Sequence, residues 1–387
     1  MIKDRLSYIL KHYIWAQSIY KFTMSRVFRF IGLFIKTDNN LVLYQSLSGS
    51  ERFDSPMAIY LKVISDERFK DLKHVWAFRS PKKSNLQGCE KVEIDTWRYF
   101  LIALKAKYWI TNTNIERGLN FKKADTVYLN TWHGMPIKHI GNDVEGRKDY
   151  DSRNVNLFCY ESDFSKDIYI RALKVNPGNL IPTGLPRNDE LYNVSENDII
   201  ELKQKLHLPL DKKIILYAPT WRDSKDKGKS YRLESPVDFV KWERLLSDEY
   251  IVLVRAHHFT TKIFNLTFNS FIRDFTSYPS INDLFKISDI LISDYSASIV
   301  DFSILERPII CFAYDYENYI KERGVYLDLE KEVPSGIFKT EDSVIAHIKN
   351  MDIQKESYLT KCFKEKFTSY GGNATNTCIK LLFANFN

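Results

Sequence analysis

The chain has 387 residues, of which 44% are hydrophobic and 27% are charged. This length is typical of two or three domains, and this composition excludes an intrinsically disordered protein. Its five cysteines show no CxxC pair and no metal-like spacing, so we expect neither a disulfide framework nor a zinc site. A reducing, cytoplasmic compartment fits this pattern.

The net charge of +7 is concentrated at the N-terminus. Residues 1–36 contain seven basic side chains and one acid, Asp4, so the segment carries +6 and leaves about +1 for the rest of the chain. An enzyme that acts on nucleic acid more often spreads positive charge over its folded body. We therefore expect no nucleic-acid partner.

Large apolar and aromatic residues are interleaved with these basic residues, and positions 6, 9, 10, 13 and 14 follow helical spacing. The longest uncharged run, 12–20, falls short of the ~20 apolar residues of a spanning helix, and no signal-peptide pattern is present. We predict one or two amphipathic helices lying on an anionic membrane surface. The alternative is a helix packed on the enzyme's own core.

From residue 41 onward, short apolar runs alternate with helical segments. The runs 41–46, 74–78, 108–113 and 126–131 form one series, with a helix at 55–65, and 213–218, 250–255 and 290–293 form a second series. This alternation predicts an α/β protein with parallel sheets, whose ligands bind at the carboxyl ends of the strands. We expect membrane-associating helices at 1–36, an N-terminal acceptor-side domain at 37–195 and a C-terminal donor-binding domain at 196–387, facing each other across a cleft.

The first polar cluster is Asn-Thr-Trp-His-Gly-Met-Pro-Ile-Lys at 130–138. Glycine and proline hold His133 in a tight loop rather than on a helix face. A histidine can take a proton from an attacking hydroxyl near neutral pH, which makes His133 a candidate general base. The alternative is a loop histidine that satisfies a backbone group.

Two further clusters follow predicted strands. Arg222 lies in the segment 217–223, where its guanidinium would suit a diphosphate. Arg255 and His257 lie in the segment 254–258 and can pair with phosphate oxygens. His257 and His258 are adjacent, but no carboxylate or cysteine stands nearby at the spacing of metal ligands, so we expect no metal.

The fourth cluster, at 292–301, is a strand that runs into a hydroxyl-rich turn and then a helix. Backbone N–H groups at the helix start, with the Ser296 and Ser298 hydroxyls, are predicted to bind an anion. Asp301, about one turn in, could reach a ribose hydroxyl. Alternatively, Ser298-x-x-Asp301 is a capping box that occupies both side chains locally.

Together these clusters resemble the CDP-glycerol glycerophosphotransferase family, which builds teichoic acids and related capsules. The matching segments run in order at 131–138, 184–189, 218–222, 255–258 and 293–301, followed by Tyr314-Asp315 and Arg323-Gly324-x-Tyr326. The departures from the family pattern are Met135, Ile137, His258 and Ala297. The resemblance implies a GT-B fold of two Rossmann-like domains, with the nucleotide donor on the C-terminal domain. It implies that His133 is the general base and that His257 is a donor-phosphate or catalytic contact.

The expected reaction moves glycerol phosphate from CDP-glycerol to a hydroxyl of a polyprenyl-diphosphate-linked saccharide and releases CMP, with no cofactor. The donor-binding residues would be Arg222, Arg255, Ser296, Ser298 and Asp301. Within the family, a CDP-ribitol enzyme or a capsule polymerase is an alternative, although the chain's size favours a primase-like enzyme. A nucleotide-sugar glycosyltransferase, an epimerase or a non-catalytic GT-B binding protein is a further alternative. We expect a peripheral protein on the cytoplasmic face of the cell membrane.

Overall fold

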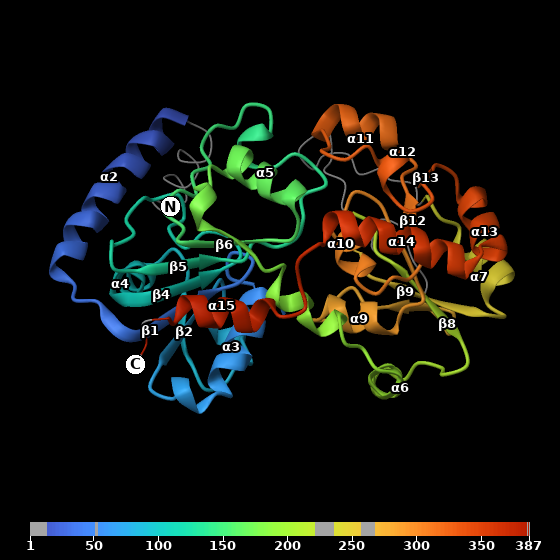
Figure 1. The fold of residues 1–387 in the computed structure, drawn as a ribbon, viewed down its shortest axis with the longest axis horizontal. Helices are drawn as coiled ribbons and strands as arrows, with labels where there is room; N and C mark the ends of the chain where they lie inside the picture. The colour runs from blue at the N-terminus through green and yellow to red at the C-terminus, as the bar shows by residue number, and fades with distance from the viewer. Residues whose placement is uncertain (1–13, 51–52, 221–235, 257–267, 385, 387) are drawn as a thin grey trace, which may run out of the picture.

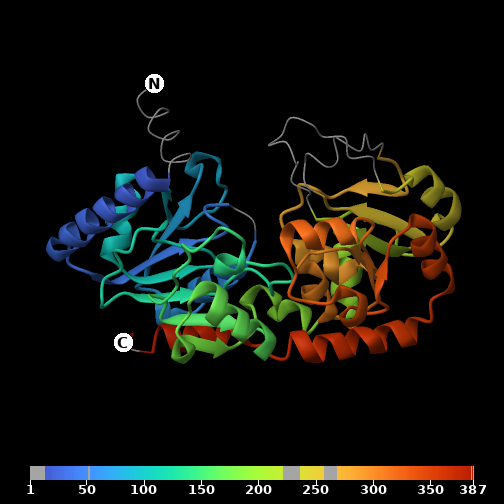
Figure 2. The ribbon, with the colours of Figure 1, turned by 90° about the horizontal axis from the view of Figure 1, so that it is seen from above.

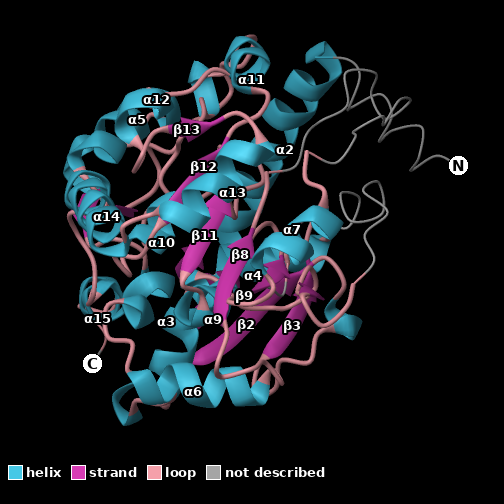
Figure 3. Cartoon of the chain, turned by 90° about the vertical axis from the view of Figure 1, so that its right-hand side faces the viewer, coloured by secondary structure: helices cyan, strands magenta, loops and turns pink. Residues whose placement is uncertain are grey.

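A computed structural model describes residues 14–50, 53–220, 236–256, 268–384 and 386. These residues form two α/β domains that lie side by side (Figure 1). Each domain is built on one parallel sheet with helices packed on it (Figure 3). The central strands of the second sheet are almost continuously apolar and buried, as expected for parallel strands covered on both faces.

The sheet of the first domain has the order β3-β2-β1-β4-β5-β6-β7, and every pair is parallel. Its strands are β1 (Asp38–Gln45), β2 (Lys73–Phe78), β3 (Glu90–Glu93), β4 (Ala106–Thr111), β5 (Val127–Asn130), β6 (Leu157–Tyr160) and β7 (Leu180–Pro182). The strands predicted at 41–46, 108–113 and 126–131 are confirmed with small shifts at their ends.

The sheet of the second domain has the order β10-β9-β8-β11-β12-β13 and is also parallel. Its strands are β8 (Lys213–Tyr217), β9 (Tyr250–Val254), β10 (Ile272–Asp274), β11 (Ile290–Ser293), β12 (Ile309–Phe312) and β13 (Ile337–Phe338). In both sheets the third strand of the domain lies at one edge and the strand order reverses beside the first strand. Such reversals, at β1/β4 and β8/β11, are where doubly wound sheets bind ligands.

Helices connect the strands. The first domain contains α2 (Ile14–Phe34), α3 (Ser55–Ile64), α4 (Trp97–Lys105) and α5 (Asp163–Leu173), and the short helix η5 (Pro186–Leu191) and α6 (Glu196–Lys205) lead to the second domain. The second domain contains α7 (Phe239–Leu246), α9 (Ile281–Ile287), α10 (Ser298–Ser303), α11 (Tyr316–Arg323), α12 (Leu329–Glu332), α13 (Glu341–Asn350) and α14 (Ile353–Phe367), and α15 (Ala374–Leu382) ends the chain.

The chain finishes on the domain where it began. Helix α14 lies along the second domain, and α15 packs on α3 and the first sheet (Figure 2). The Sγ atoms of Cys159 on β6 and Cys378 on α15 are 3.5 Å apart. This return was not predicted, because the expected C-terminal domain ran unbroken from 196 to 387.

Within the predicted N-terminal segment, residues Ile14–Phe34 form the helix α2, and its contact with a membrane stays a prediction. Phe28 is only 1% exposed and packs between Phe100 and Phe121, so one face of α2 belongs to the core of the first domain. Other large apolar side chains remain exposed, among them Trp15, Ile19, Phe22, Phe30, Leu33 and Phe34. In the part of the chain that the structure describes, we find no helix long and apolar enough to cross a membrane.

Candidate active site

The loop that carries His133 is shaped by polar side chains at the carboxyl ends of β4 and β5. Asn130 Oδ1 accepts a hydrogen bond from the Trp132 amide at 2.9 Å, and Asn130 Nδ2 donates to the Thr113 carbonyl at 2.7 Å. Trp132 itself has a left-handed backbone, with φ 55°. This turn presents His133 to solvent while its neighbours 131–132 and 134–137 are buried.

The His133 ring is held in one orientation. Its Nδ1 lies 2.8 Å from the main-chain oxygen of Asn112. A carbonyl can only accept, so Nδ1 carries the hydrogen and the lone pair of the neutral ring is on Nε2. The His133 side chain is exposed to solvent on one side, and surrounding protein atoms remove part of the water from around its ring. This burial lowers the pKa of His133 below its usual value, although the bond to Asn112 opposes the shift.

The His133 loop touches the start of α10 in the second domain. Gly134 has φ +129°, and a Cβ at this position would lie 2.8 Å from the Cβ of Ala297. Only glycine allows this approach. Gly134, the residue next to the predicted base, thus packs against Ala297 in the hydroxyl-rich turn at Ser296–Ser298.

The turn before α10 is organised by Ser296, whose Oγ accepts from the Ser298 amide at 3.2 Å and donates to Ser298 Oγ at 3.0 Å. The N-cap of α10 is Ala297, which makes no side-chain cap bond. The capping-box alternative for Ser298 and Asp301 is therefore wrong. Ser298 occupies the first helical residue rather than the cap, and Asp301 bonds to residues outside the helix.

Asp301 belongs to a buried ion network that joins the two domains. Its Oδ2 accepts from Arg187 Nη2 at 2.7 Å, and its Oδ1 accepts from Asn188 Nδ2 at 2.7 Å. Arg187 also donates to Asp54 Oδ2 at 2.6 Å and to the His133 carbonyl at 3.2 Å. Arg187 is paired with both carboxylates, and both ion pairs are buried. Both Asp301 oxygens therefore have protein partners, and a ribose hydroxyl would have to share one of them.

A second buried carboxyl lies under the same loop. Glu161, at the end of β6, accepts from the Tyr169 hydroxyl at 3.1 Å, and that hydroxyl is 3.5 Å from the Gly134 carbonyl. Desolvation, with the nearby negative charge of Asp301, raises the pKa of Glu161 to about 7. Glu161 is thus poised to change charge near neutral pH beside the His133 loop.

Of the remaining predicted donor residues, the structure describes Arg255, which lies beside the second sheet. Arg255 follows β9, and its Nη1 donates to the Phe275 carbonyl at 3.5 Å and to the Tyr278 carbonyl at 2.5 Å, so these contacts fix the guanidinium beside the strand end. Arg222 and His257 fall outside the described residues.

Comparisons with known proteins identify the family of this chain. The family model of the CDP-glycerol:poly(glycerophosphate) glycerophosphotransferases matches residues 27–384. The chain belongs to this family. The expected family and the expected enzyme class, a transferase, are thereby confirmed.

Relatives of this glycerophosphotransferase-family chain include a teichoic acid glycerol-phosphate transferase of Staphylococcus aureus, 31% identical over 99% of the chain and 100% of that protein. A teichoic acid poly(glycerol phosphate) polymerase of Bacillus subtilis is 33% identical over 80% of the chain, and one of Staphylococcus epidermidis is 32% identical over 86%. The chain spans 44% and 49% of the lengths of these two polymerases.

Among solved structures, a variant of the wall teichoic acid polymerase TagF superposes with a TM-score of 0.80 at 30% identity, covering 90% of this chain and 89% of that chain. The same polymerase after a 15-minute soak with CDPG superposes with a TM-score of 0.79 at 28% identity, covering 90% of each chain. These likenesses confirm the GT-B fold.

Sequence reasoning assigned no role to the residues that join the domains at the site, namely Asp54, Arg187 and Asn188, or to Glu161 and Tyr169 under the His133 loop. A signal was present for two of them, since Arg187 and Asn188 lie in the family element 184–189. The same element supplies Asp189, whose carboxylate accepts from the amides of Ala374 and Thr375 at the start of α15. Residues 184–189 are therefore the junction of the two domains and the C-terminal helix.

Proposed function

We propose that this glycerophosphotransferase-family enzyme moves glycerol phosphate from CDP-glycerol to a hydroxyl of a polyprenyl-diphosphate-linked saccharide in teichoic acid or related capsule synthesis. The acceptor oxygen forms a bond to the β-phosphorus, the bond between the β-phosphorus and the bridging oxygen breaks, and CMP leaves. The glycerol-phosphate relatives support this donor, because one of them aligns with 99% of the chain.

The observation that carries the proposal is the His133–Asn112 bond of 2.8 Å. It leaves the lone pair on Nε2, as a general base requires. The lowered pKa keeps the ring neutral at pH 7 and so able to accept a proton. The acceptor hydroxyl would give its proton to His133 Nε2 as it attacks.

The donor phosphates would lie at the start of α10 and the ends of β8 and β9. The Ser296 and Ser298 hydroxyls would donate hydrogen bonds to the phosphate oxygens. The positive charges of Arg222, Arg255 and His257 would offset the negative charge that develops as CMP departs. We keep Asp301 as the proposed ribose contact, shared with Arg187 and Asn188. Ala297 replaces a serine of the family pattern and so removes one hydroxyl near the donor phosphates. His258 replaces a proline of the pattern.

A lipid-linked acceptor would be reached from the cytoplasmic face of the cell membrane. The proposed contact is the exposed apolar side of α2, and the positive charge of residues 1–36 would attract anionic headgroups. Exposed aromatic residues on α2, including Trp15 and Phe22, support this placement.

A turnover assay tests the function directly. Purified enzyme is incubated with a lipid-linked disaccharide and either CDP-glycerol or CDP-ribitol, and released CMP is measured together with the mass of the lipid product. We expect CMP and a product one glycerol phosphate heavier with CDP-glycerol, and none with His133→Ala. Turnover of CDP-ribitol alone would make CDP-ribitol the donor, and a donor that binds without reacting would favour a non-catalytic binding protein.

A further inference from the structure

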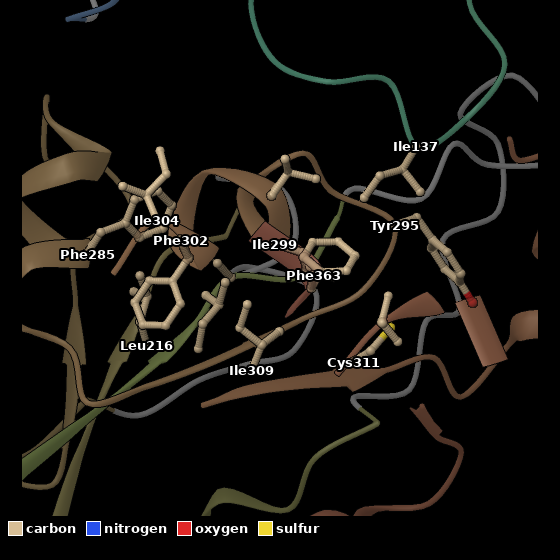
Figure 4. Packing of buried hydrophobic residues seen from close by; sticks show 14 of the residues in the cluster. Ile137, Leu216, Phe285, Tyr295, Ile299, Phe302, Ile304, Ile309, Cys311 and Phe363 are labelled. Atoms are coloured by element: carbon tan, nitrogen blue, oxygen red, sulfur yellow. The ribbon is translucent and has the colours of Figure 1, made fainter. Parts of the chain in front are cut away.

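The loop that carries His133 belongs to the first domain by sequence but packs into the core of the second. Met135 and Ile137, each 1% exposed, lie in one apolar cluster with Tyr295, Ile299 and other residues of the second domain. Figure 4 shows Ile137, carried by a loop from the first domain, beside Tyr295. Burying two large apolar side chains stabilises this attachment.

The backbone continues the same attachment. Lys138 and Val325 form an antiparallel bridge between the domains. On either side of it, the His139 amide donates to the Gly324 carbonyl at 3.2 Å, and the Tyr326 amide donates to the Ile137 carbonyl at 2.8 Å. We refer to residues 137–140 and 324–326 as the interdomain bridge.

Tyr326 anchors the far end of the interdomain bridge to the first domain. Its hydroxyl accepts from the Ile140 amide at 3.1 Å and donates to Asp143 Oδ2 at 2.8 Å. Asp143 is in turn bound by Arg171 of α5 at 3.0 Å, and the Arg171 guanidinium lies over the Tyr326 ring. One side chain of the second domain thus ends in a charged network of the first.

Gly324 is required by the close approach of the two segments. Its φ is +66°, and a Cβ at this position would lie 2.4 Å from Nδ1 of His139. Any other residue would push His139, and with it the loop, away from the second domain. This contact gives a physical role to the Arg-Gly-x-Tyr motif, which the proposed chemistry does not use.

We propose that Tyr326 and Ile137 are positioning residues that fasten the His133 loop to the donor-binding domain. The base is then held at a fixed distance from the donor's β-phosphate. This inference rests on the proposed function, since it takes His133 as the base and the second domain as the donor site. A misplacement of about 1 Å can lower a rate by about 10²-fold.

The main test is Tyr326→Phe, which removes two hydrogen bonds and keeps the ring. We expect kcat to fall by about 10- to 100-fold, with the KM for CDP-glycerol and the melting temperature close to wild type. Tyr358→Phe, on the exposed face of α14, is the matched control and should leave all three unchanged. An unchanged kcat, or a raised KM at unchanged kcat, would overturn the proposal.

Two further pairs of variants separate positioning from general damage. Ile137→Leu restores the residue of the family pattern and should retain kcat, whereas Ile137→Ala should lose it. Gly324→Ala should lower kcat, whereas Gly146→Ala, at a similar φ of +76° but with open space around it, should not. Equal effects within either pair would count against the proposal.

Hydrogen exchange separates failure of this inference from failure of the proposed function, because it needs no substrate. In the free full-length enzyme, Tyr326→Phe should speed amide exchange in peptides that cover 131–143, while peptides of α14 stay unchanged. Unaltered exchange there would refute the bridge whatever the donor. Faster exchange in an enzyme that ignores CDP-glycerol would refute the proposed function and leave the attachment of the loop standing.

Discussion

His133 Nδ1 and the main-chain oxygen of Asn112 lie 2.8 Å apart, and this bond links the loop after β5 to the loop after β4, the strand that borders the reversal at β1/β4. The bond fixes the tautomer of the ring. Because the partner is a backbone atom, the sequence at position 112 cannot remove it. The orientation of the proposed base is therefore a property of the sheet itself.

We expect the acid limb of the kcat–pH profile to fall below pH 6.5, the usual value for histidine, because the pKa of His133 is lowered by burial. Protonation below that limb removes the lone pair on Nε2. His133→Ala should lower kcat by about 10²–10⁴-fold and keep CDP-glycerol affinity. Steady-state rates and calorimetry measure both quantities, and a variant within a few-fold of wild type would remove His133 from catalysis.

Ser298→Ala and Asp301→Ala should separate donor binding from stability. Ser298 Oγ caps no helix, so its loss should weaken CDP-glycerol binding and leave the melting temperature nearly unchanged. Asp301→Ala leaves Arg187 paired with Asp54 but removes the buried acceptor of Arg187 Nη2 and Asn188 Nδ2, which should destabilise the protein by about 1–3 kcal/mol. Calorimetry measures the donor affinity of both variants, and chemical denaturation measures their stability. If Asp301→Ala lowers stability without changing affinity, its proposed ribose contact fails.

The sequence predicts features that are local in the chain. The strands, the His133 loop and the hydroxyl-rich turn each follow from patterns within about ten residues. The ion network does not, because Arg187 lies 133 residues from Asp54 and 114 from Asp301. Nothing in the local pattern of a short helix says which distant carboxylate its arginine meets.

Contacts between residues far apart in sequence also explain why the sequence predicts a helix in the N-terminal segment but not the burial of one of its faces. Residues 14–34 form the predicted helix, but burial of Phe28 depends on Phe100 and Phe121, which are far away in sequence. An amphipathic pattern alone cannot distinguish a membrane from the protein's own core. The family motif at 184–189 marked Arg187 as notable, yet only the folded chain shows that it joins two domains.

Glu161 should make stability depend on pH. Its pKa rises from 4.5 to about 7 in the folded protein, so the folded state binds a proton that the unfolded state releases. The resulting stability is complete below pH 4.5 and is lost as the pH rises to about 7. The loss is on the order of 3 kcal/mol. Glu161→Gln should flatten this dependence, whereas Glu249→Gln, on the surface, should not. Urea midpoints from pH 5 to 8 decide the matter, and parallel curves for wild type and Glu161→Gln would contradict it.

Substituting the exposed apolar side chains of α2 should weaken binding to anionic vesicles. Deletion of residues 1–36 would be ambiguous, because Phe28 is part of the core. The triple variant Phe30→Ser, Leu33→Ser and Phe34→Ser changes side chains that are 63%, 78% and 75% exposed and should leave the fold intact. Val240→Ser, at a 79% exposed position in the second domain, is the control.

Co-sedimentation with vesicles at low and high salt measures the effect. The basic residues contribute about 1 kcal/mol each near an anionic surface, and salt screens them. Apolar insertion is not screened, so wild-type binding should fall at high salt without vanishing, whereas the triple variant should lose the salt-resistant part. Turnover of a water-soluble acceptor should survive the substitutions, and turnover of the lipid-linked acceptor should drop, because the membrane no longer concentrates enzyme and acceptor together. A triple variant that sediments as wild type does would place the membrane contact away from α2.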